Sequence, residues 1–141
     1  MTTVFSRIIA GEIPGRFVWS DDRCAAFLTI EPLQPGHVLV VPREEISHWV
    51  DLPTDLAGHV FAVAQTIGKA QQQAFDPARI GLLVQGYEVP HAHVHVWPSR
   101  SAADFDLGAT SPAAEEDLDR AAETLREALR QAGHDARVPT S

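Results

Sequence analysis

Hydrophobic residues along the chain follow two patterns, one typical of a long helix and one typical of short strands. Over residues 53–75, apolar side chains recur at intervals of three and four, which predicts a helix with one buried face. Short apolar runs bounded by Gly, Pro or Asp predict five strands. These runs are Phe17 to Ser20, Cys24 to Ile30, His37 to Val41, Arg79 to Gln85 and Ala92 to Trp97.

Further helical signals stand near both ends of the chain. Residues 4–10 are amphipathic and are closed by Gly11, which predicts a short N-terminal helix. After a loop over residues 99–111, Ser111 suits a helix N-cap and Pro112 suits the first helical position. The apolar stripe of this C-terminal helix ends at Gly133 and consists of Leu118, Ala122, Leu125, Leu129 and Ala132. The elements together predict an α+β fold, with a mostly antiparallel five-stranded sheet, one long helix, a short N-terminal helix and an appended C-terminal helix.

Composition limits the class of protein. The formal net charge is -8 and the basic residues form no cluster, which argues against non-specific nucleic-acid binding. No apolar run approaches the roughly 20 residues of a membrane span, and the first residues lack the apolar run of a signal peptide. Cys24 is the only cysteine, so an intrachain disulfide and an all-cysteine zinc site are both excluded. We therefore expect a cytoplasmic protein with neither a nucleic-acid nor a membrane partner.

The strongest chemical signal is the run His91-Ala92-His93-Val94-His95. Side chains of a strand alternate between its faces, so the three histidines point to one side while Ala92 and Val94 point to a core. Three neighbouring imidazoles are costly to bury without partners. They suit metal ligation, or a nucleophile whose neighbours donate hydrogen bonds to an anion. A solvated edge strand with incidental histidines is the third possibility.

Metal ligation needs more ligands than this strand offers. The first and last histidines of a straight strand lie about 13 Å apart, so only adjacent pairs could share one ion. Further ligands would have to come from elsewhere in the chain, where His37, His48 and His59 are the candidates. We therefore expect no metal at the histidine run.

The segments around the histidines resemble the histidine triad (HIT) family. Residues 89–97 match the His-x-His-x-His motif of that family, which is flanked by hydrophobic residues. Residues 5–14, 21–28 and 35–43 resemble three further family motifs in the same order. The resemblance leaves the C-terminal helix outside it. It implies a HIT-like fold, a small-molecule nucleotide substrate, no cofactor, and a homodimer whose sheet extends across both copies.

The resemblance also implies a role for each of four histidines. His93 would attack the α-phosphorus of the nucleotide, and water would then release the mononucleotide from the nucleotidyl-histidine. His95 would donate a hydrogen bond to a phosphate oxygen. His91 and His37 would orient or support His93.

A nucleoside pocket follows from the same resemblance. Thr29 stands where the family usually has an aspartate that grips the ribose, and Gln85 stands where an asparagine is common. Glu88 lies near a phosphate-contacting position, where its charge would repel an anion. The residues implied in substrate binding are Phe5, Ile8, Phe27, Thr29, Ile30, Gln85, Glu88 and Val89. Zinc-binding members carry Cys-x-x-Cys where Thr3 and Ser6 stand, so we expect no structural zinc.

The function expected from these residues is that of a nucleotide hydrolase or nucleotidyl transferase. It would cleave at the α-phosphorus of a purine nucleotide conjugate, of the nucleoside phosphoramidate or dinucleoside polyphosphate type, through a nucleotidyl-His93 intermediate. Thr29 and Glu88 favour one alternative, a nucleotide-binding protein with little turnover, and the other is a metal-dependent hydrolase that uses the histidines as ligands. The expected division of the chain is a HIT-like catalytic domain over 1–110, a C-terminal helix packed on the same domain over 111–133, and a frayed tail over 134–141.

Overall fold

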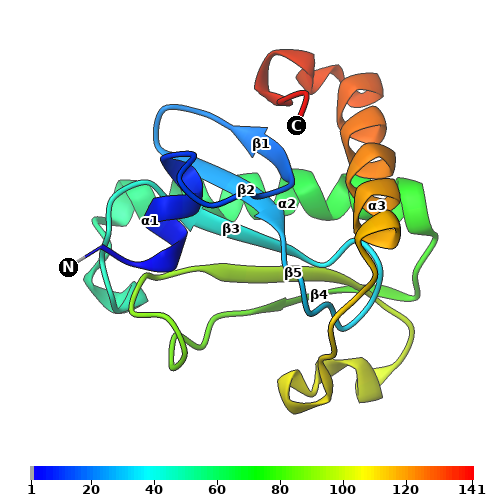
Figure 1. Ribbon diagram of the computed structural model, residues 1–141, viewed down its shortest axis with the longest axis horizontal. Coiled ribbons are helices and arrows are strands. Elements are labelled where there is room, and N and C mark those ends of the chain that lie inside the picture. The colour runs from blue at the N-terminus through cyan, green and yellow to red at the C-terminus, as the bar shows by residue number, and fades with distance from the viewer. Residues whose placement is uncertain (1) are drawn as a thin grey trace.

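A five-stranded antiparallel sheet forms the centre of the computed structural model, which describes residues 2–141 (Figure 1). The spatial order of the strands is β1-β2-β3-β5-β4, and each neighbouring pair is antiparallel. The strands are β1 (Phe17–Ser20), β2 (Cys24–Leu28), β3 (Val38–Pro42), β4 (Arg79–Leu83) and β5 (Val94–Ser99). The predicted α+β class and five-stranded antiparallel sheet are therefore confirmed.

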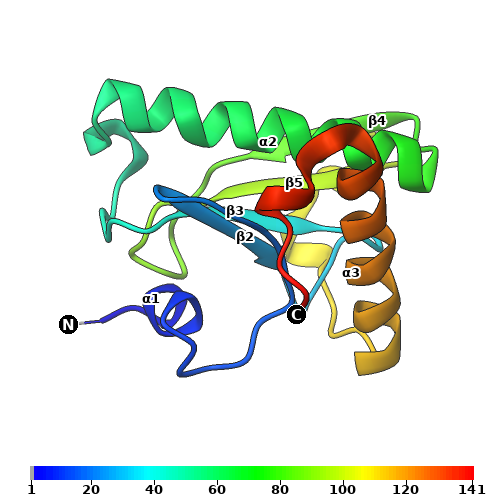
Figure 2. The ribbon, with the colours of Figure 1, turned by 90° about the horizontal axis from the view of Figure 1, so that it is seen from above.

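Helices cover both faces of this sheet. The long helix α2 (Thr54–Phe75) lies across one face, with α3 (Glu115–Leu129) beside it, whereas the short α1 (Val4–Ile9) lies on the other face (Figure 2). The apolar stripe predicted for residues 53–75 is the buried side of α2, and Asp76 ends the helix in the left-handed conformation, with a φ of 47°. No helix within residues 2–141 has both the length and the apolar character needed to cross a membrane.

The two faces of the sheet carry separate apolar clusters. Alternation along β2 directs Cys24, Ala26 and Leu28 toward the cluster under α2 and α3, and directs Phe27 toward the cluster under α1. The α1 cluster consists of Phe5, Phe27, Leu39 and Val41, with Ile8, Ile9, Phe17 and Val89 packed against it. Leu39 pairs with His95 in the sheet, so His95 also faces α1.

Several strand boundaries differ from the prediction by one or two residues, and β3 as a whole is shifted by one residue, to Val38–Pro42. β2 ends at Leu28 rather than Ile30, and β4 ends at Leu83 rather than Gln85. β5 begins at Val94 rather than Ala92, because the N–H of Ala92 donates to the carbonyl of Ile46 in a loop instead of to a neighbouring strand. Two of the three histidines therefore precede the sheet.

The C-terminal helix also differs in its limits. α3 begins at Glu115 rather than at Pro112, and Ser111 caps no helix. The reason is that the preceding segment is extended, and the N–H of Ala113 donates to the carbonyl of Ile30. A single π-helical turn, Arg130–His134, follows α3, and Gly133 within it leaves the helical conformation with a φ of +95°. Ala132 is exposed and lies outside the apolar stripe.

Segments expected to lack structure contain short helical turns. The loop before α3 holds 3-10 turns at Ala102–Phe105 and Leu107–Ala109, the first closed by a capping box between Ser101 and Asp104. Within the tail, which we expected to fray, Asp135–Arg137 form another 3-10 turn. Val138 packs against the cluster under α2 and α3.

Replacement of Leu125 by alanine tests whether α3 shares the core of the sheet. Leu125 is fully buried, so the substitution should lower the free energy of unfolding by about 2–5 kcal/mol in urea denaturation. The control Phe61→Ala, on a side chain of α2 that is 60% exposed, should change it by less than about 0.5 kcal/mol. A separate transition for the C-terminal helix would contradict a single domain.

Candidate active site

A cleft of about 150 Å³ lies beside the histidines on the α1 side of the molecule. Its walls come from the loop after β2, the loop after β4, the histidine run and the 3-10 turn near Leu107. The lining residues are Thr29, Glu31, His37, Gln85, Gly86, Tyr87, Glu88, His93, His95, Leu107 and Thr110. The chain thus brings His37, which is distant in sequence, to the same cleft as two of the three predicted histidines.

His91 is a buried anchor rather than a cleft residue. Its Nε2–H donates to the carbonyl of Pro42 at 2.7 Å, and the hydroxyl of Thr3 donates to its Nδ1 at 2.8 Å. Glu45 fixes the residues that contact His91, because its carboxylate accepts the N–H of Thr3 at 2.8 Å and the hydroxyl of Ser6 at 2.7 Å. These bonds attach α1 to the loop that carries the triad.

His93 is held in a single tautomer by the backbone of His91. Its Nδ1 lies 2.7 Å from the carbonyl oxygen of His91. Because a carbonyl can only accept, Nδ1 carries the proton and Nε2 keeps its lone pair. The ring packs between Phe5 and His95, with ring centroids 4.7 Å and 5.0 Å away. A neutral imidazole with a free Nε2 is the form that can attack phosphorus.

A second chain of hydrogen bonds fixes the tautomer of His95. The N–H of Leu33 donates to Nδ1 of His37 at 3.1 Å, so His37 carries its proton on Nε2. That Nε2–H donates to Nδ1 of His95 at 3.0 Å. Nε2 of His95 therefore carries a proton and is a hydrogen-bond donor in the cleft.

The turn that places His37 requires glycine at the preceding position. Gly36 has a φ of +89°, and a Cβ there would lie 2.5 Å from the ring of Phe75. His37 follows directly and is 2% exposed. The tight turn thus directs the His37 ring toward His95 while the chain enters β3.

Burial keeps these imidazoles neutral at pH 7. It lowers the pKa of His37 to about 3, with a further contribution from His95, and it lowers the pKa of His95 to about 4, with a further contribution from His93. The pKa of His93 is also lowered by burial, although its bond to the His91 carbonyl and the charge of Glu88 oppose the shift. The tautomers deduced from hydrogen bonding therefore hold at neutral pH.

These depressed pKa values make the free energy of unfolding depend on pH. In the unfolded chain a histidine has its ordinary pKa of 6.5. Below that pH, the histidines of the unfolded chain bind protons, whereas the buried histidines of the native state stay neutral. Stability is therefore full above about pH 6.5 and falls toward pH 4, by at most about 1.4 kcal/mol per pH unit for each histidine. Urea denaturation at pH 7.5 and pH 5 measures this loss. We expect His37→Gln to reduce it, and an equal loss in that variant would contradict the assignment.

The predicted apolar binding residues divide between two places. Phe5, Ile8, Phe27 and Val89 meet in the cluster under α1, and the ring of Phe5 joins this cluster to His93. Ile30 does not join them, because β2 has already ended and its side chain is 67% exposed.

The predicted polar binding residues all line the cleft. Thr29, Gln85 and Glu88 form part of its walls. The hydroxyl of Thr29 accepts the N–H of Glu31 at 3.2 Å.

Several lining residues escaped prediction. Glu31 adds a second carboxylate to the cleft, and Leu107 and Thr110 come from a loop with no periodic pattern. Their approach to the histidines depends on the turns at residues 102–109, which the composition of the loop did not indicate.

Comparison with known proteins matches the part of the chain that carries the histidines of the cleft. The family model described as the HIT domain matches residues 10–102, which include His37 and the complete triad. This chain belongs to the histidine triad family. This chain is 36% identical over 99 residues to an uncharacterized HIT-like protein of Methanocaldococcus jannaschii. The aligned residues cover 67% of this chain and 77% of the relative.

Two further comparisons concern activity and structure. The HIT protein is 33% identical over 86 residues to a bifunctional bis(5'-adenosyl)-triphosphatase/adenylylsulfatase of Arabidopsis thaliana, covering 57% of this chain and 47% of the relative. A solved Hit-like protein of Bartonella henselae, described as involved in cell-cycle regulation, superimposes with a TM-score of 0.80 at 29% identity, covering 90% and 96% of the two chains. The HIT-like fold is therefore shared with solved members of the family.

Proposed function

We propose that this HIT protein is a nucleotide hydrolase or nucleotidyl transferase. Its substrate would be a purine nucleotide conjugate, either a nucleoside phosphoramidate or a dinucleoside polyphosphate, cleaved at the α-phosphorus. The observation that carries the proposal is the tautomer of His93. Its Nδ1–H donates a hydrogen bond to a backbone carbonyl, so Nε2 keeps its lone pair. The Arabidopsis relative, named as a dinucleoside triphosphatase, supports the substrate class.

The mechanism has two displacements at phosphorus. Nε2 of His93 attacks, a P–N bond forms, and the bond from phosphorus to the leaving group breaks. The carbonyl of His91 stabilises the positive charge that develops on the ring, because it accepts the Nδ1–H. Nε2–H of His95 donates to a phosphate oxygen as charge gathers there. Water then displaces the histidine and releases the nucleoside monophosphate.

Substrate binding would use the remaining predicted residues. The base would lie against the apolar cluster that contains Phe5 and Phe27, with the ribose near Thr29. A threonine hydroxyl can share one hydrogen bond with a ribose hydroxyl but supplies no charge. Glu31 and Glu88 line the cleft, and none of its described lining residues is Lys or Arg, so the phosphate depends on His95 and other neutral donors.

The two alternative functions make different use of the same residues. A nucleotide-binding protein with little turnover is favoured by the carboxylates of Glu31 and Glu88, which disfavour anionic transition states. A metal-dependent hydrolase is disfavoured, because only the Nε2 atoms of His93 and His95 lack a hydrogen-bond partner among the four described imidazoles. Two nitrogens fall short of the three protein ligands typical of catalytic zinc, and among residues 2–141 no carboxylate or other ligand atom lies close enough to both to complete a set of three.

Trapping of the intermediate tests the proposal. Wild-type protein is mixed with an adenosine phosphoramidate, quenched in milliseconds to seconds, and examined by intact-mass and peptide mass spectrometry. We expect an adenylyl group on the peptide that contains His93, together with release of AMP. Binding of the nucleotide without an adduct or AMP release would contradict the enzymatic function and support the nucleotide-binding protein with little turnover.

A homodimer is the second part of the proposal. Within residues 2–141, β4 pairs only with β5, so its other edge is open, and Leu82 on this strand is 42% exposed. A second copy placed edge to edge at β4 would continue the sheet. Light scattering after size exclusion should give a dimer mass for the wild type and a monomer mass for Leu82→Asp. A monomeric wild type at micromolar concentration would exclude the dimer.

We also propose a cytoplasmic location, in keeping with the single free cysteine.

A further inference from the structure

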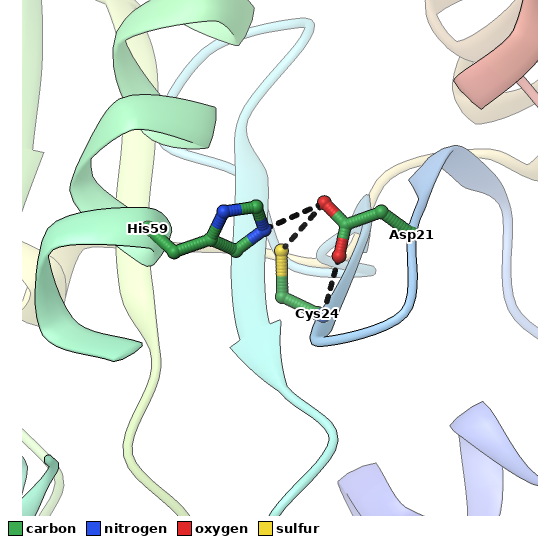
Figure 3. A group of neighbouring side chains, drawn as sticks. All are labelled: Asp21, Cys24 and His59. Atoms are coloured by element: carbon green, nitrogen blue, oxygen red, sulfur yellow. Dashed lines mark hydrogen bonds and ion pairs between the residues drawn. The ribbon is translucent and has the colours of Figure 1, made fainter. Parts of the chain in front are cut away.

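Asp21, Cys24 and His59 form a polar cluster on the face of the sheet opposite the triad (Figure 3). Asp21 lies in the turn between β1 and β2, Cys24 begins β2, and His59 comes from α2. One donor atom from each residue lies within 4.8 Å of the other two. Oδ2 of Asp21 is at the centre, 2.8 Å from Nε2 of His59 and 3.6 Å from Sγ of Cys24.

This arrangement is unsuited to nucleophilic catalysis. In a Cys-His-Asp triad the imidazole lies between the thiol and the carboxylate, whereas here the carboxylate lies between the other two groups. Cys24 is also fully buried, and burial together with the negative charge of Asp21 raises the pKa of its thiol. The cluster therefore offers ligands but no reactive nucleophile.

The donor set fits zinc. Thiolate sulfur, imidazole nitrogen and carboxylate oxygen are the three kinds of atom that bind Zn²⁺ in proteins. Tetrahedral coordination places such atoms roughly 3.3–3.5 Å apart, given the usual zinc–ligand bond lengths. The sulfur–oxygen distance of 3.6 Å already matches, and the nitrogen–oxygen distance of 2.8 Å requires His59 to move outward by about half an ångström.

The carboxylate is held in place by groups outside the three ligands. Oδ1 of Asp21 accepts the backbone N–H groups of Arg23 at 2.8 Å and Cys24 at 2.9 Å, and Oδ2 accepts Nε1–H of Trp19 at 2.8 Å. Outer hydrogen bonds of this kind orient carboxylate ligands in metal sites. They fix Asp21 whether or not a metal is bound, so the position of one ligand is already set.

We propose that Asp21, Cys24 and His59 bind one zinc ion. It replaces two of the three protons that Oδ2 of Asp21 accepts, those of the Cys24 thiol and the His59 imidazole, and leaves the bond from Trp19 in place. The thiol releases one proton to water as its sulfur binds the metal. The proton on Nε2 of His59 is exchanged through water for one on Nδ1, leaving the Nε2 lone pair for the metal. The side chain of His59 is 32% exposed, so metal and a fourth, water ligand reach the site from that side.

Two positive side chains lie near the turn that carries Asp21 and Cys24. Arg43 donates to the carbonyl of Asp21 at 2.7 Å, and Arg23 forms an exposed ion pair with Asp55 of α2 at 2.9 Å. A bound metal would cross-link this turn to α2 and would stabilise the fold without taking part in the chemistry at His93.

Cobalt titration distinguishes this site from the histidine triad. Cys24 is the only cysteine, so a thiolate-to-cobalt charge-transfer band can arise from no other place in the chain. Full-length protein freed of metal is titrated with Co²⁺ and then with Zn²⁺. We expect the band to saturate at one cobalt per chain and to disappear as zinc replaces it, and zinc alone to raise the Tm by several degrees.

Variants assign the ligands. Cys24→Ser should abolish the band and the zinc-induced rise in Tm, and His59→Gln should weaken cobalt binding at least tenfold. His48→Gln, on an exposed histidine, and His93→Ala, in the triad, should both keep the band. Absence of the band in the wild type, or its persistence at full strength in His59→Gln, would overturn the proposal. Because these readouts use no nucleotide, they do not depend on the proposed enzymatic function.

Discussion

Replacement of His93 by alanine is expected to lower kcat for AMP release from an adenosine phosphoramidate by a factor of about 10⁴ or more. The reason is that, among the described residues of the cleft, Nε2 of His93 is the only imidazole lone pair that no hydrogen bond occupies, since Nδ1 is protonated and bound to the His91 carbonyl. KM should change far less, because the base and ribose are held by other residues. Initial rates over a range of substrate concentrations separate the two constants.

Two controls accompany this variant. His93→Asn keeps an N–H that can reach the His91 carbonyl and fills part of the space beside Phe5, yet it has no nucleophilic nitrogen, so it should be as inactive as alanine. His48→Ala, on an exposed histidine, should keep wild-type kcat. An active His93→Asn variant would exclude a nucleotidyl-His93 intermediate.

The sheet and the long helix could be predicted because each repeats a local pattern. Alternation and helical spacing depend only on neighbours in sequence, and Pro or Gly marks most of the element ends. Ser111 failed as a marker because a contact between Ala113 and the distant Ile30 keeps the chain extended there. A contact of this kind leaves no periodic signal.

The candidate site also has a part that the sequence predicts and a part that it does not. The triad and Phe5 are visible as motifs, whereas the bonds that orient them join residues far apart in the chain. Thr3 meets His91 across 88 positions, and His37 meets His95 across 58. The grouping of Cys24 with Asp21 and His59 likewise depends on how α2 crosses the sheet. No sequence motif marks this grouping, and the sequence therefore led us to expect no structural zinc.

The second large effect is expected for His95. Among residues 2–141, its Nε2–H is the imidazole donor in the cleft that no protein group accepts, and removal of a comparable donor from an oxyanion site costs about 10²–10³ in kcat. His95→Ala should therefore lower kcat by that factor and slow the formation of the His93 adduct. His95→Gln, whose amide can still donate, should recover part of the loss, as measured by rapid-quench mass spectrometry.

His37 provides the matched test of how His95 is oriented. His37→Gln can accept the Leu33 N–H with its oxygen and donate to Nδ1 of His95 with its nitrogen, so the tautomer of His95 is retained. His37→Leu leaves that Nδ1 without a donor and should approach the kcat of His95→Ala. Equal rates for the Gln and Leu variants would mean that His95 works without the relay from Leu33. A loss confined to KM in His95→Ala would make His95 a binding residue rather than a donor to the transition state.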